Sequence, residues 1–359
     1  MINILSKYSP NLFISLFSFS KENSTILKGY GILFMIFHHC FGLNALPSGV
    51  DINWVTPEII KFSGVFKICV SIFIFITGYA LGLKTYQHPS PFTFLERGVS
   101  HYIKFWKTYL LCLLLVILIS WVIPTPGLTT PDHFGWEKWI FAFSGLFPPY
   151  FDWWYMGLFA FGSLILYPVA SLITNRKTPV IALINLLLLS LLLHLMLLMV
   201  PSSAFYRDII LFSPLFVFGY TCALITNTIG NMSRKEYYIA LLVLLLEICL
   251  IHFLAFSSAK KWTFPFLFTI WILPWLTKKI HLTNLLMLLG SYSALMWLNH
   301  RFIFGYHFSQ PLYGTHSYFL VYGLTLLGSF LLAVAMQWTF QKIFRQISLF
   351  WKMIVKKTL

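Results

Sequence analysis

Long apolar segments alternate with short polar or proline-containing stretches along almost the whole chain. Most of these segments are about 20 residues long, the length that a helix needs to cross the hydrocarbon layer of a membrane. The sequence lacks the period-two alternation that marks the strands of an outer-membrane barrel. We therefore expect ten membrane helices, near residues 26–45, 63–83, 102–123, 153–173, 179–200, 207–227, 236–256, 262–277, 284–305 and 318–341.

The composition agrees with a helical membrane protein. Hydrophobic residues make up 58% of the 359 residues, charged residues only 10%, and the mean hydropathy is +0.80. Soluble domains contain about 25% charged residues, so this chain cannot cover an ordinary water-exposed surface. The predicted fold class is all-α, a polytopic bundle with an N-terminal cytoplasmic or interfacial segment (1–25), one transmembrane domain (26–345) and a basic cytoplasmic tail (346–359).

The distribution of charge predicts the orientation of the bundle. The formal net charge is +15, and most of the 25 Lys and Arg residues fall on the side of the membrane that holds the N-terminus. Cytoplasmic connections are rich in Lys and Arg, so we expect both termini in the cytoplasm and the protein in the inner membrane, in contact with its lipids. Topology explains the basic surplus, and nucleic acid is not an expected partner. Lys260 and Lys261 lie on the other side and go against this assignment.

Two further features have mainly structural interpretations. The five cysteines all lie in apolar segments without a close pair, which is typical of packing thiols, so we expect neither disulfides nor a metal site. The connection 124–152 contains five prolines and several tryptophans. Trp prefers the membrane interface, so part of this connection is expected along the outer surface, with a lid over a cavity as the alternative.

The first predicted helix carries unusual polar residues, Lys28, His38 and His39. Ionisable groups within membrane helices are costly and mark functional sites, although a Lys at a helix end also serves as an anchor and a single His also binds a neighbouring carbonyl. Lys28 and His39 are eleven positions apart, which is about 16 Å and almost three whole turns. They therefore share one face, with His38 about 100° away. A histidine in this position is suited to general base catalysis.

These residues resemble the signature of the acyltransferase-3 family of membrane acyltransferases, in which a Lys or Arg is followed by ten residues and a His on the first helix. Further segments agree in order and spacing: Phe73 to Tyr79 with Thr77-Gly78, Lys104-Phe-Trp-Lys107 before a Tyr, Trp154-Tyr155 followed by Tyr167-Pro168, and Ser291-Tyr292-Ser293 followed by Trp297 and His300. The resemblance covers residues 24–345. It departs from the family where Lys104 and Lys107 replace arginines, because Lys lacks the bidentate fork of Arg.

The resemblance implies an acyl-CoA donor, acetyl-CoA in most cases, and no metal. The cationic connection with Arg97, Lys104 and Lys107 would bind the phosphates of CoA, although a plain positive-inside loop explains the same charges. The pantetheine arm reaches about 18–20 Å, the length of five or six extended residues, which matches the depth of His39. In this interpretation His39 is the general base, with His38 beside it, Lys28 holds a CoA phosphate or supports an acid near His39, and Ser71 or Thr77 stabilises the oxyanion.

Four residues are candidates for binding the acceptor: Lys67, Trp154, His300 and Arg301. Lys67 would pair with Asp51 or Glu58 or contact an anionic acceptor. His300 and Arg301 would line an entrance at the outer end of their helix, and Trp154 would stack on a sugar or belong to an aromatic belt. Glu247, deep in the seventh predicted helix, would pair with a base or stay protonated.

We therefore predict a membrane O-acyltransferase, most often an O-acetyltransferase, that modifies a hydroxyl of a surface glycan or of its lipid-linked precursor. The main alternative is a polysaccharide or lipid transporter without covalent chemistry. That class is marked by inverted repeats and paired broken helices, which the sequence does not show. A membrane acyltransferase of another class, with its histidine late in the chain at His300, is the third possibility.

Overall fold

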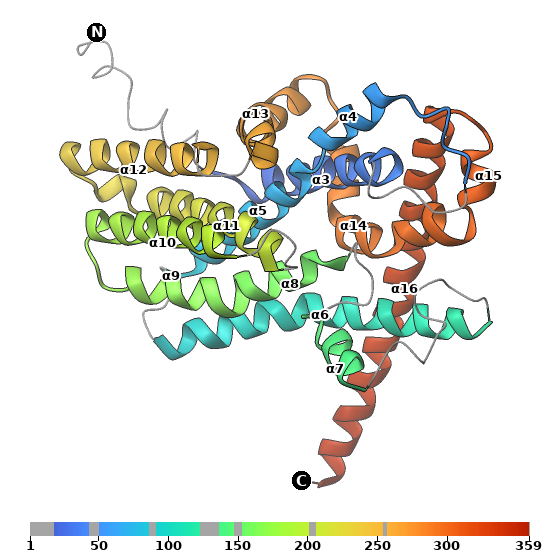
Figure 1. Cartoon of the computed structure of the whole chain (residues 1–359). Coiled ribbons are helices and arrows are strands. Elements are labelled where there is room, and N and C mark those ends of the chain that lie inside the picture. Colours follow the sequence, from blue (N-terminus) through green and yellow to red (C-terminus); the bar gives the residue numbers. More distant parts are fainter. Residues whose placement is uncertain are drawn as a thin grey trace.

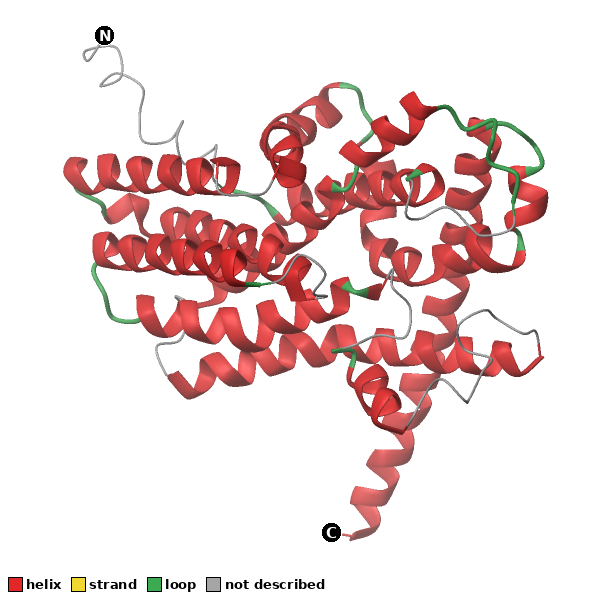
Figure 2. Cartoon of the chain, viewed as in Figure 1, coloured by secondary structure: helices red, strands yellow, loops and turns green. Residues whose placement is uncertain are grey.

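The computed structural model describes residues 18–42, 50–85, 91–122, 136–146, 153–200, 206–253 and 257–358, and within these ranges the secondary structure is entirely helical (Figures 1 and 2). The elements are α3 (Lys21–Phe41), α4 (Pro57–Val65), α5 (Ile68–Thr85), α6 (Pro91–Val122), α7 (Trp136–Ser144), α8 (Tyr155–Phe161), η3 (Gly162–Leu166), α9 (Tyr167–Thr174), α10 (Pro179–Met199), α11 (Tyr206–Thr228), η4 (Ile229–Asn231), α12 (Arg234–Phe253), α13 (Ser257–Lys279), α14 (Thr283–Arg301), η5 (Phe302–His307), α15 (Ser309–Tyr313) and α16 (Tyr318–Thr358).

Each predicted membrane span overlaps one or more helical elements of the structure, which confirms a helical membrane protein. Six helical stretches of the described residues are long and apolar enough to cross a membrane: Pro57–Thr85, Phe92–Ile119, Tyr155–Thr174, Pro179–Met199, Arg207–Asn231 and Tyr318–Gln346. The remaining four predicted spans correspond to α3, α12, α13 and α14, which are 19 to 23 residues long. The count of ten spans and the cytoplasmic termini stay predictions.

Two pairs of helices pack closely through glycines. A side chain at Gly290 of α14 would overlap the carbonyl oxygen of Thr25 in α3, and one at Gly29 would overlap that of Leu286. In the same way, Gly78 of α5 and Gly219 of α11 lie directly against the partner backbone. Small residues let membrane helices approach at backbone distance, so these contacts fix α3 on α14 and α5 on α11.

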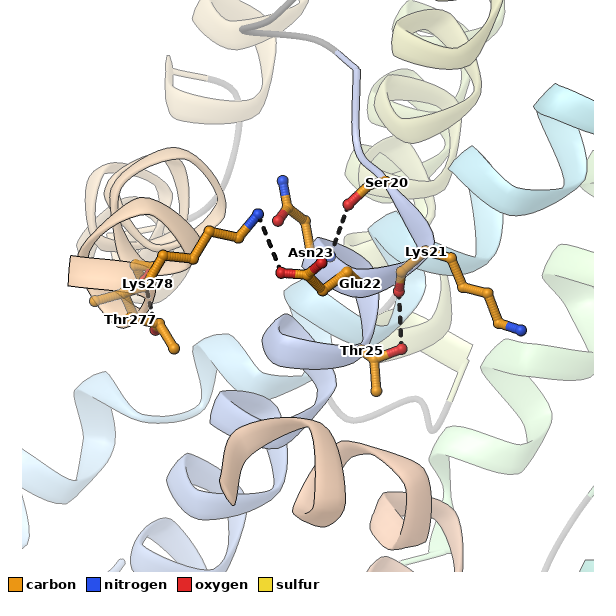
Figure 3. A network of polar contacts seen from close by, with 8 residues as sticks. Ser20, Lys21, Glu22, Asn23, Thr25, Thr277 and Lys278 are labelled. Atoms are coloured by element: carbon orange, nitrogen blue, oxygen red, sulfur yellow. Dashed lines mark hydrogen bonds and ion pairs between the residues drawn. The ribbon is translucent and has the colours of Figure 1, made fainter. Parts of the chain in front are cut away.

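The start of α3 is held by a network of polar contacts (Figure 3). Ser20 caps the helix by accepting a hydrogen bond from the Asn23 amide at 3.0 Å, and the Thr25 hydroxyl donates to the Lys21 carbonyl at 2.8 Å. Glu22 forms an ion pair with Lys278 of α13 at 3.1 Å. These contacts join α3 to α13 one to two turns before Lys28.

The connection 124–152 is described only from residue 136 to 146, and the rest lies outside the described residues. Its helix α7 ends against α6, where Tyr102, Trp106 and Tyr109 donate hydrogen bonds to the carbonyls of Ser144, Phe143 and Ala142, respectively. Side-chain donors of this kind satisfy the carbonyls at a helix end that its own backbone leaves open. The described part of the connection is therefore attached to the side of α6.

Candidate active site

A cavity of about 760 Å³ lies between α3, the α4–α5 segment, α6, α8, α11 and α14. Lys28 and His39 both line it, as their predicted common helix face requires, so the cavity follows α3 for about 16 Å. His38 lines it too, although the helical period places its side chain on another face. The part of α7 that the structure describes contributes no lining residue, and the rest of the connection 124–152, for which a lid was the alternative, lies outside the described residues.

The two ends of the cavity are polar and its middle is apolar. We call one the Lys28 end, lined by Lys28, His101 and Lys104, and the other the Lys67 end, lined by His38, His39, Lys67, Trp154 and Asp208. Between them lie mainly apolar side chains, among them Met35, Phe73, Phe105 and Trp297. A flexible ligand with one polar head and an apolar stem fits this distribution.

His39 is held by a second histidine. Its Nδ1 lies 2.6 Å from Nε2 of His300, and Nδ1 of His300 lies 2.6 Å from the carbonyl oxygen of Trp297. A carbonyl only accepts hydrogen bonds, so Nδ1 of His300 is the donor there and Nε2 of a neutral His300 is an acceptor. His39 therefore donates from Nδ1, and its lone pair is on Nε2. The chain of hydrogen bonds assigns the tautomer that a general base needs.

This position differs from the one predicted for His300 and Arg301, which were expected at an acceptor entrance. His300 is completely buried, and neither residue lines the cavity. The reason is the close packing of α14 on α3, which turns the face with His300 toward His39. The sequence of one apolar helix does not show which helix packs beside it, so the contact between His39 and His300 could not be predicted.

His38 is oriented separately from His39. Its Nδ1 lies 2.9 Å from the carbonyl oxygen of Ser63 in α4, and its ring centroid is 5.5 Å from that of His39. Because the carbonyl accepts, Nδ1 of His38 is the donor. Two imidazoles thus face the same part of the cavity, held by different elements.

At the Lys28 end the structure revises the predicted cationic patch. Lys104 lines the cavity, whereas Lys107 is exposed and Arg97 donates a hydrogen bond to the Lys84 carbonyl, and neither lines it. His101, rather than Lys107, lines the cavity together with Lys104. It is one turn before Lys104 on the same helix face, a spacing that the sequence shows and that could have identified it.

His101 is positioned by an irregular helix. Its Nδ1 lies 3.2 Å from the hydroxyl of Ser163, and its ring centroid is 5.0 Å from that of Phe159. Ser163 belongs to the π-helix η3, and π-helical turns are frequent at functional sites. Lys28 and Lys104 both lie within electrostatic range of this ring, so the Lys28 end is a cationic pocket.

At the Lys67 end the chain turns between α4 and α5, and Lys67 lies in this turn. Its ammonium group is 3.8 Å from a carboxylate oxygen of Asp208 in α11. The predicted partners were Asp51 and Glu58, but the bundle brings the first turn of α11 to this place instead. Asp208 was missed because nothing in a single sequence relates the two segments.

Of the other candidates Ser71, Thr77 and Glu247, Thr77 lines the cavity. Ser71 is buried and does not line it, whereas Thr77 does and donates to the Phe73 carbonyl at 2.8 Å. Glu247 is completely buried and accepts a hydrogen bond from Thr221 at 3.0 Å. This partner is a hydroxyl of α11, whereas the sequence left open pairing with a base or a protonated carboxyl.

A comparison with known protein families gives a match over nearly the whole chain. The family model described as an acyltransferase domain, Acyl_transf_3, matches residues 22–338, nearly the whole chain. No curated protein and no solved structure matches the chain. The matched range includes every residue that lines the cavity.

Proposed function

Since the chain belongs to the acyltransferase-3 family and is a multi-pass membrane acyltransferase, we propose that it transfers an acetyl group from cytoplasmic acetyl-CoA to a hydroxyl of an extracytoplasmic or lipid-linked glycan. The observation that carries this proposal is the cavity with Lys28 and Lys104 at one end and His39 near the other. The Lys28 end faces the cytoplasm in the orientation predicted from charge. We place the protein in the inner membrane, because that membrane borders the cytoplasm that supplies the donor.

The donor enters from the Lys28 end. Lys28, His101 and Lys104 offer cationic or hydrogen-bonding groups to the phosphates of acyl-CoA. The pantetheine arm extends along the apolar middle of the cavity, and its reach of about 18–20 Å brings the thioester to His39. Arg97 and Lys107 remain outside the cavity and contribute to the positive potential around its mouth.

His39 acts as the general base. Its Nε2 accepts the proton of the acceptor hydroxyl while the hydroxyl oxygen attacks the thioester carbonyl carbon. The tetrahedral intermediate collapses with cleavage of the C–S bond, and the CoA thiolate takes the proton from the His39 imidazolium. His300 is a positioning residue, because its Nε2 accepts the hydrogen bond that keeps the proton of His39 on Nδ1.

The test is release of CoA thiol from acetyl-CoA by the purified protein, with and without a glycan acceptor, together with labelling of the acceptor by radioactive acetyl. Replacement of a general base lowers the rate about 10²–10⁴-fold, so His39→Ala should lose transfer and keep acetyl-CoA binding. The matched control is His194→Ala, which removes a buried histidine bonded to the Ser190 carbonyl of α10, outside the cavity.

Two results would contradict the proposal. Transfer at the wild-type rate by a folded His39→Ala protein would exclude His39 as the base. Transport of the glycan acceptor across the membrane of vesicles that contain the protein, without release of CoA, would favour a transporter.

A further inference from the structure

The ion pair between Lys67 and Asp208 has no structural purpose that its geometry explains. The two charged atoms are 3.8 Å apart, and the side chains are 28% and 37% exposed. Pairs of this exposure and length contribute little to stability. Both members line the cavity, on the side of His39 opposite to Lys28.

Aromatic side chains complete the surroundings of this pair. Phe212 lies one turn after Asp208 on α11, and the Lys67 ammonium is 6.0 Å from the centre of its ring. Trp154 packs on Phe212 with ring centroids 5.7 Å apart, and Trp154 itself lines the cavity. Together Lys67, Asp208 and Trp154 form a polar pocket with one aromatic wall, which we call the outer subsite.

The chemistry of the outer subsite fits an uncharged ligand rich in hydroxyl groups. An ammonium group is only a donor and an ionised carboxylate only an acceptor, whereas each sugar hydroxyl is both. The pair therefore binds neighbouring hydroxyls at once, and hydrogen bonds to charged groups are stronger than those between neutral groups. The cation of the outer subsite, Lys67, already faces Asp208, so a carboxylate or phosphate on the ligand would have to compete with Asp208 for it.

Resting on the function proposed above, we propose that Asp208 and Lys67 bind the acceptor, and that the acceptor unit is a neutral sugar. Asp208 accepts hydrogen bonds from its hydroxyls, Lys67 donates to them, and Trp154 packs on its apolar edge. His39 lines the same cavity and takes the proton of the hydroxyl that is acylated. A uronic acid or a sugar phosphate would bring an uncompensated negative charge beside Asp208.

The proposal is tested with p-nitrophenyl β-glucoside, the matching β-glucuronide and acetyl-CoA. Binding of each glycoside to the purified full-length protein is measured by saturation-transfer NMR, and transfer is measured by CoA release. The wild type should bind the glucoside at least tenfold more tightly than the glucuronide. Asp208→Asn should weaken glucoside binding about tenfold, narrow or reverse the preference, and leave the KM for acetyl-CoA unchanged.

The control breaks a comparable ion pair elsewhere. Glu22→Gln removes the pair with Lys278, which is 3.1 Å long and more exposed but lies outside the cavity (Figure 3). It should change neither glycoside binding nor preference. If Asp208→Asn folds poorly, Lys67→Met tests the other member of the pair: glucoside binding should again weaken about tenfold, but the preference over the glucuronide should widen, because Asp208 is left without its cation.

Binding and transfer separate the two proposals. Glucoside binding that depends on Asp208 without CoA release would refute the reaction and support the subsite. Transfer to the glucoside with an unchanged KM in Asp208→Asn would overturn the subsite and leave the reaction standing. A wild type that binds neither probe, or binds the glucuronide as tightly as the glucoside, would also overturn the subsite.

Discussion

Replacing His300 tests whether the histidine pair works as a unit. His300→Ala removes the acceptor 2.6 Å from Nδ1 of His39 and the donor to the Trp297 carbonyl. A buried polar group that loses its partner costs about 1–3 kcal/mol. If that penalty raises the barrier of the chemical step, kcat falls about 5- to 150-fold, since 1.36 kcal/mol is a factor of ten.

The second variant, His300→Gln, separates positioning from packing. A glutamine carries a side-chain oxygen that accepts a hydrogen bond from Nδ1 of His39, so it should recover part of the lost kcat. Both variants are assayed for kcat and for the KM of donor and acceptor, with acetyl-CoA binding as the measure of a folded protein. We expect a fall in kcat with little change in either KM.

Two outcomes would refute this reasoning. A kcat unchanged in His300→Ala would show that His39 needs no such partner. A raised acceptor KM at constant kcat would instead identify His300 as an acceptor contact, as the sequence first suggested.

Two further predictions concern the donor pocket and the helix packing. Lys104→Met should raise the KM for acetyl-CoA about 10- to 100-fold, because a charge-assisted hydrogen bond is worth about 1.5–3 kcal/mol. Lys107→Met, one turn along α6 and outside the cavity, should change this KM less than twofold. Equal effects of the two substitutions would place the donor elsewhere. Gly290→Leu should destabilise the protein by about 1–3 kcal/mol and lower the yield of folded protein in detergent, because the new side chain meets the Thr25 carbonyl. The matched control is Gly323→Leu, since no atom lies within 4 Å of the added carbon there. Similar losses in both variants would contradict the tight α3–α14 contact.

Apolar runs predicted the helices well but not their ends. The third predicted span began near residue 102, whereas α6 begins at Pro91, because Glu96 and Arg97 interrupt the hydropathy of a helix that continues through them. In the same way α16 continues to Thr358 through the basic tail. Hydropathy measures what is buried in lipid, while a helix also continues into water.

The site was predictable where one helix decides it. Lys28 and His39 share a cavity because the helical period alone places them on one face. Contacts between distant segments were not predictable: His39 with His300, and Lys67 with Asp208, are set by packing that leaves no trace in local spacing. His101 is the intermediate case, since its spacing from Lys104 is visible but the π-helix that presents Ser163 to it is not.

The glycine contact between α3 and α14 sets the alignment of the two helices that brings the histidines together. Gly29 is ten residues before His39, and Gly290 is ten residues before His300. Because the two glycines are in contact with each other and so are the two histidines, the two helices run parallel and in register. A slip of one residue along either helix would move its histidine by about 1.5 Å and turn it by about 100°. A single inserted residue between glycine and histidine in only one helix would therefore separate the rings, and so would one inserted in both, because it would turn both histidines by about 100° in the same sense and off the contact face. Seven residues inserted in both helices, about two whole turns, would return both rings to the contact face.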